Sequence, residues 1–178
     1  YLLAVLVSEA GPISVYFGRR LLINGLSLPD SVPSGQDIPI EVDMALPGLP
    51  NHMIKVSFGL TVVIPYGWPG FGFAHKYPVR TSFFFVSPSL FDTISQYPEF
   101  QGKVIELLEG QQHISGVIPG IYLGEKRTYY PIPPGIYPIL SGAQWWSVTI
   151  DEEGAHFSVP EGPSVIWGKV MTTEISII

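Results

Sequence analysis

The chain has 178 residues, which is enough for one ordinary domain with a sizeable core. Charged residues make up 13%, about half the ~25% of an average soluble domain, and apolar residues make up 46%, which excludes a disordered chain. The net charge of -6 excludes a basic footprint for nucleic acid, and the absence of cysteine excludes disulfides and thiolate chemistry. The 19 glycines and 18 prolines favour a turn-rich protein over a helical one.

The first seven residues are uniformly apolar. A membrane helix needs about 20 such residues, so we expect no membrane span here or further along the chain. Because the sequence starts at Tyr1 rather than Met, we expect a processed product or a fragment. This start is also compatible with secretion, and we expect an extracellular or cell-surface location.

In chain order, the first turn signal is Asn24 with Gly25, which lies between two short apolar runs and predicts a hairpin with a type I′ turn. Residues 37–44 then alternate apolar and polar side chains, which predicts a half-buried strand with one solvated face. Pro39 places this strand near a sheet edge or at a strand start, because proline cannot donate to the ladder. Further strands are predicted at residues 2–7, 54–58, 60–64, 82–86, 146–150 and 155–159, with a hairpin turn at residues 151–154.

One segment departs from this pattern. Ser89 followed by Asp92 is a helix-capping signal, and residues 103–109 have helical spacing that ends at Gly110. We therefore predict a small helical insertion near residues 89–109, made of one or two short helices.

Turn signals recur roughly every ten residues, which is typical of an all-β sandwich. We predict an antiparallel sandwich of about ten short strands, either immunoglobulin-like or jelly-roll-like. It is expected to form a single domain over residues 11–178, preceded by an apolar extension at residues 1–10.

The residues that usually carry catalysis are scattered. His52, His75, His113 and His156 show no metal-binding spacing, and no Gly-x-Ser-x-Gly elbow is present. The acidic residues 151–153 favour a solvated turn, with a calcium site as the alternative. We therefore predict no enzymatic activity, no cofactor and no metal site.

Two aromatic segments are candidates for contacts. Trp68, Phe71 and Phe73 are a candidate aromatic contact patch, which would stack on sugar rings or another subunit, or would close the core as a lid. Residues 129–138 are rich in proline and tyrosine, and we interpret them as an ordered edge segment, with an exposed partner ligand as the alternative.

The apolar N-terminal strand is unusual, because chain ends are normally polar and frayed. This strand precedes the break at Gly11 and Pro12 and is followed by a series of short strands, an arrangement that resembles fibre subunits assembled by donor-strand complementation. In that family, the N-terminal segment of each subunit completes the sandwich of the next one. The resemblance implies a subunit interface at Leu2, Leu3, Val5, Leu6 and Val7.

Our hypothesis from the sequence is a structural, self-assembling subunit of an extracellular fibre, which polymerises by inserting its N-terminal strand into a neighbouring subunit. The expected partners are identical subunits, with no nucleic acid and no membrane span. The alternatives are a carbohydrate- or ligand-binding module built on the aromatic contact patch, in which a glycan is the partner, and a viral jelly-roll coat protein. An enzyme whose site assembles from distant segments is a further alternative.

Overall fold

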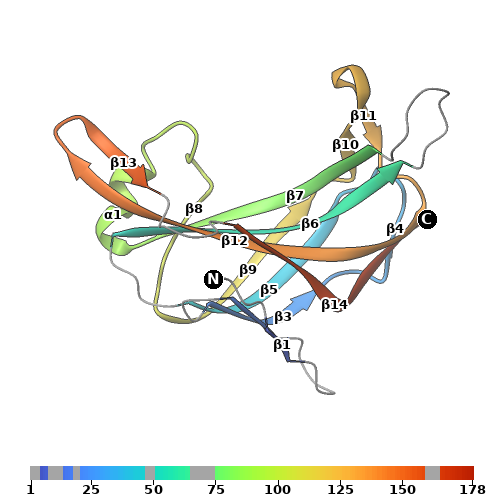
Figure 1. Cartoon of the computed structure of the whole chain (residues 1–178), viewed down its shortest axis with the longest axis horizontal. Helices are drawn as coiled ribbons and strands as arrows, with labels where there is room; N and C mark the ends of the chain where they lie inside the picture. The colour runs from blue at the N-terminus through green and yellow to red at the C-terminus, as the bar shows by residue number, and fades with distance from the viewer. Residues whose placement is uncertain (1–4, 8–13, 18–20, 47–50, 65–74, 159–164) are drawn as a thin grey trace.

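The computed structural model describes residues 5–7, 14–17, 21–46, 51–64, 75–158 and 165–178, and the structural statements below concern these residues. Strands dominate the described part, which contains one α-helix, so the predicted all-β class is confirmed. The long strands β6, β7 and β12 run along the longest axis of the molecule (Figure 1).

Five strands form one antiparallel sheet in the order β1-β2-β3-β5-β9, which we call the N-terminal sheet. Its strands are β1 (Val5–Val7), β2 (Ser14–Phe17), β3 (Leu21–Ser27), β5 (Ile38–Leu46) and β9 (Gly110–Ile118). The strand β1 lies at one edge of this sheet and β9 lies at the other.

The longer strands form a second sheet in the order β4-β14-β12-β6-β7-β8, which we call the long-strand sheet. Its strands are β4 (Ser31–Val32), β14 (Val165–Ile177), β12 (Gly135–Asp151), β6 (His52–Ile64), β7 (His75–Val86) and β8 (Val104–Glu106). The strand β13 (Gly154–Ser158) pairs with β12, and β10 (Ile121–Leu123) forms a separate hairpin with β11 (Tyr129–Pro131).

The two sheets enclose one main core, and the alternation of the sequence explains how. Every second residue of β5 is fully buried, whereas Glu41 and Asp43 between them are exposed. The facing side of β6 contributes Val56 and Phe58, and Phe58 packs edge-on against Phe83 with ring centres 6.2 Å apart. The immunoglobulin-like and jelly-roll-like types of sandwich stay predictions, as does the division at residue 10.

A smaller core lies on the opposite face of the long-strand sheet. There the helix α1 (Pro88–Ile94) covers Met53 and Val86 with Leu90 and Ile94. This helix starts at Pro88 with Ser87 as its N-cap residue, so the predicted cap at Ser89 was wrong by two residues.

The predicted helix at residues 103–109 is also wrong, because residues 104–106 form the edge strand β8, parallel to β7. The reason is visible in the packing of two consecutive side chains. Val104 packs against the smaller core and Ile105 packs against the main core, so the segment contributes to both faces of the sheet. Two consecutive side chains point to opposite faces in a strand but not in a helix, so this packing requires a strand.

The predicted hairpin at Asn24 and Gly25 is wrong as well, since β3 runs through both residues. The register with β5 shifts between Ile23 and Gly25, which marks a bulge. A Cβ atom on Gly25 would lie 3.3 Å from Oδ2 of Asp43, so the glycine leaves room for the facing carboxylate.

The strands of the long-strand sheet are longer than the sequence suggested. Residues 54–58 and 60–64 were predicted as two strands, but they belong to the 13-residue strand β6. Gly59 lies inside this strand, where β6 and β7 approach each other closely. A Cβ atom at this position would lie 2.1 Å from the carbonyl oxygen of Val79, so the close approach requires a glycine. The predicted hairpin turn at residues 151–154 is confirmed, with Asp151 paired to Gly154.

Candidate assembly surfaces

The N-terminal strand was predicted to be the subunit interface. Leu2 and Leu3 lie outside the described residues, whereas Val5, Leu6 and Val7 form β1. Within the single chain, β1 pairs with residues 14–16 of β2. The N-terminal strand is therefore the edge strand of its own sheet, and it has one strand partner among the described residues.

The opposite edge of the N-terminal sheet is longer. All nine residues of β9 pair with β5, and no other described strand pairs with β9. In an antiparallel ladder, alternate residues of an edge strand point their N–H and C=O groups away from the partner strand. The strand β9 thus presents a row of backbone groups along its outer side.

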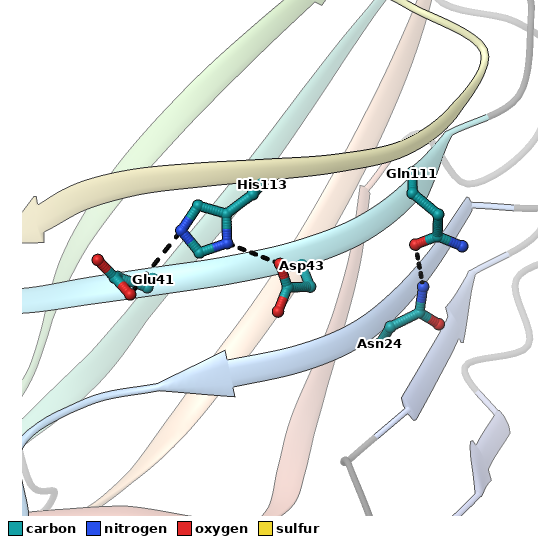
Figure 2. Close-up of polar contacts among 5 residues, drawn as sticks. All are labelled: Asn24, Glu41, Asp43, Gln111 and His113. Carbon is teal, nitrogen blue, oxygen red and sulfur yellow. Dashed lines mark hydrogen bonds and ion pairs between the residues drawn. The ribbon is translucent and has the colours of Figure 1, made fainter.

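A polar ladder lies on the solvent side of this sheet, as Figure 2 shows. His113 on β9 sits directly opposite Asp43 on β5, and its Nδ1 atom is 2.6 Å from Oδ1 of Asp43. The other ring nitrogen lies 3.8 Å from Oε2 of Glu41. Asn24 on β3 donates a hydrogen bond of 2.7 Å from Nδ2 to Oε1 of Gln111 on β9.

The hydrogen bond to Asp43 is the largest influence on the pKa of His113 and raises it. Desolvation lowers this pKa by less, and the negative charges of Asp43 and Glu41 each make a smaller contribution that raises it. Two carboxylates on β5 therefore favour the cationic imidazole on the edge strand. Sequence reasoning placed Glu41 and Asp43 on one solvated face, but it gave no signal that His113, 70 residues from Asp43, lies beside them.

Two hairpins extend beyond the sheets toward opposite ends of the molecule (Figure 1). One consists of β10 and β11, and the other of the end of β12 with β13. Residues 129–138 were predicted to be an ordered edge segment, and they include β11 and the first four residues of β12. Trp68, Phe71 and Phe73 lie outside the described residues, so the aromatic contact patch stays a prediction.

Within the described ranges, no group of three or more histidine or acidic side chains is placed to hold a metal ion. No helix in the same ranges is long and apolar enough to cross a membrane. No protein-family model matches the chain, and no curated protein matches it either.

Proposed function

We propose that this protein is a structural subunit of an extracellular fibre, and that identical copies join through the N-terminal strand. The observation that carries the proposal is the strand order of the N-terminal sheet, in which β1 and β9 occupy opposite edges. Edge strands offer unpaired N–H and C=O groups to an incoming strand. Pairing of β1 from one copy with β9 of the next would continue the sheet from subunit to subunit.

The two edges are different surfaces, which decides the kind of assembly. A contact between two different surfaces propagates into a filament when its rotation does not close a ring, whereas a contact of one surface with itself gives a closed dimer. Joining β1 to β9 is a contact of the first kind. It differs from insertion into a groove, because β1 keeps its partner β2 and adds the neighbour's β9 on its other side.

The pairing within the sheet explains what a neighbour would contribute. Among the described residues, three residue pairs join β1 to β2, whereas nine join β5 to β9. A second partner adds main-chain hydrogen bonds to β1, which has the fewest paired residues of the described strands in this sheet. Each apolar side chain of residues 1–7 that becomes buried adds roughly 1.5–3 kcal/mol, of which ordering and association remove a large share.

The test is negative-stain electron microscopy of the purified chain beside two variants. Val5→Asp places a charge on β1, and Ser27→Asp places the same charge at an exposed position on the interior strand β3. We expect fibres from the unchanged protein and from Ser27→Asp, and dispersed particles from Val5→Asp, because a charge without a partner is costly to bury.

Circular dichroism shows whether Val5→Asp is still folded. Fibres from a folded Val5→Asp variant, or dispersed monomers from the unchanged protein, would contradict the proposal. Closed shells would favour the jelly-roll coat protein instead.

A further inference from the structure

We propose that the two projecting hairpins form a second contact between copies, in which a basic hairpin of one copy binds an acidic hairpin of the next. The basic hairpin comprises residues 121–131, and the acidic hairpin comprises residues 147–158. The inference rests on the proposed function, since it assumes that identical copies assemble. It concerns surfaces other than the β1 and β9 edges.

The basic hairpin presents an apolar outer face. In its central pair, Tyr122 is buried against the body of the protein, where its ring centre lies 5.1 Å from that of Tyr77, whereas its partner Tyr130 is 40% exposed. The flanking pairs therefore point outward, because successive residues of a strand face opposite sides. Ile121, Leu123 and Tyr129 are 41%, 48% and 65% exposed.

The tip of this hairpin is positively charged. The 3-10 turn Glu125–Arg127 carries one acidic and two basic side chains, all exposed. Glu125 has a neighbour within the molecule, since its Oε1 atom lies 3.9 Å from Nε2 of His75. Lys126 and Arg127 make no ion pair with any described residue, so both cations face solvent at the tip.

The acidic hairpin is held against the body in a comparable way. The hydroxyl oxygen of Tyr97 accepts a hydrogen bond of 2.7 Å from the backbone N–H of Ala155. The ring of Phe157 lies 5.6 Å from that of Phe100. Ile150 and Phe157 nevertheless remain 44% and 36% exposed, which places apolar surface beside the tip.

The tip of this second hairpin is negatively charged. The carboxylate of Asp151 lies 3.0 Å from Nε2 of His156. The same carboxylate accepts a hydrogen bond from the backbone N–H of Glu153. The carboxylates of Glu152 and Glu153 are exposed and make no ion pair with any described residue. Two carboxylates therefore face solvent here, as two cations do at the basic hairpin.

Charge complementarity selects a second copy as the partner. With a net charge of -6, copies of this chain repel one another in most orientations. The approach of Lys126 and Arg127 to Glu152 and Glu153 is attractive, and opposite charges steer such an encounter. Both tips carry exposed apolar side chains nearby, which supply area to bury once the tips have met.

Charge reversal in the full-length chain tests this contact by sedimentation velocity at about 0.1 M salt, where the Debye length is about 10 Å. One variant is Lys126→Glu with Arg127→Glu, and the other is Glu152→Lys with Glu153→Lys. We expect each variant alone to associate at least tenfold more weakly than the unchanged protein. An equimolar mixture should regain the association, because the two reversed tips complement each other.

Glu106→Lys with Glu109→Lys is the matched control for the second variant, because it makes the same change in net charge as Glu152→Lys with Glu153→Lys, at exposed positions outside both hairpins. We expect this control to associate as the unchanged protein does. A mixture that associates no more strongly than its components would overturn the inference. So would association of the unchanged protein that is unaffected by about 1 M salt, where the Debye length is about 3 Å.

The Val5→Asp background separates this inference from the proposed function. In this background we expect the strand contact to be lost and a weaker, salt-sensitive association to persist. Either charge-reversed double variant, added to Val5→Asp, should remove this remaining association. If Val5→Asp leaves fibres intact while charge reversal abolishes association, the proposed function fails and the hairpin contact stands. If Val5→Asp abolishes fibres and charge reversal changes nothing in either background, the hairpin contact fails and the proposed function stands.

Discussion

His113 on β9 and Asp43 on β5 lie directly opposite each other, and Nδ1 of the imidazole is 2.6 Å from Oδ1 of the carboxylate (Figure 2). This contact joins an edge strand to an interior strand of the N-terminal sheet. Because the proposed fibre contact uses the outer side of β9, the pair also holds the register of the strand that would receive a neighbour.

The pair makes the stability of β9 depend on pH. The hydrogen bond to Asp43 raises the pKa of His113 above its ordinary value of about 6.5. The contribution of the pair to stability is therefore fully present below that value, and it is lost as the pH rises through the folded-state pKa. We expect the NMR titration midpoint of His113 to fall in Asp43→Asn and to stay unchanged in the control Asp92→Asn.

The thermal stability of the same variants provides a second readout. The melting temperature of Asp43→Asn should fall further below that of the unchanged protein at about pH 6 than at about pH 9, where a smaller fraction of His113 is protonated. An equal difference in melting temperature at both pH values would show that the Asp43 carboxylate does not stabilise protonated His113. An unchanged titration midpoint of His113 in Asp43→Asn would show the same.

The close approach of β6 and β7 at Gly59 predicts that this glycine does not tolerate an added methyl group. In Gly59→Ala the new Cβ atom would lie 2.1 Å from the carbonyl oxygen of Val79 and 2.8 Å from Cα of Arg80, so backbone must move. We expect a loss of about 1–3 kcal/mol in the free energy of unfolding, measured with urea. Gly25→Ala is the control, because its nearest contact is a carboxylate oxygen at 3.3 Å, and it should cost less.

Tyr97 is expected to stabilise the acidic hairpin through a single hydrogen bond. In Tyr97→Phe the backbone N–H of Ala155 loses its 2.7 Å acceptor, which typically costs about 1 kcal/mol. The amide of Ala155 should then exchange with solvent about fivefold faster, as followed by NMR. Tyr129→Phe, at an exposed position, should leave that rate unchanged; equal rates in all three proteins would mean that the bond contributes nothing.

The sequence predicted best where one face of a strand is solvated. Residues 37–44 alternate strictly, and Ile38–Leu46 is the observed strand β5. It failed at residues 104–106, because consecutive apolar residues fit a helix as well as a strand: Val104 and Ile105 are both apolar and belong to different cores. The hairpin prediction at Asn24 and Gly25 failed for another reason: a bulge and a turn use the same residue types, and the structure has a bulge there.

The candidate surfaces were predictable only in part. The apolar composition of residues 1–7 indicated a strand, but its position at a sheet edge depends on pairings that only the fold reveals. The same holds for the pair of His113 and Asp43, whose register is set by the whole length of β9 against β5. The acidic turn at residues 151–154 was predictable because it is local.

Cysteine cross-linking tests the central claim, the joining of β1 to β9, most directly, because the chain has no cysteine of its own. Leu6→Cys with Ser115→Cys places one thiol on each edge, and Leu6→Cys with Glu174→Cys is the control, with its second thiol on the long-strand sheet. With a short bismaleimide, we expect the first pair to give a ladder of covalent oligomers that the control and the single variants lack. Monomers or dimers alone from the first pair would contradict the account.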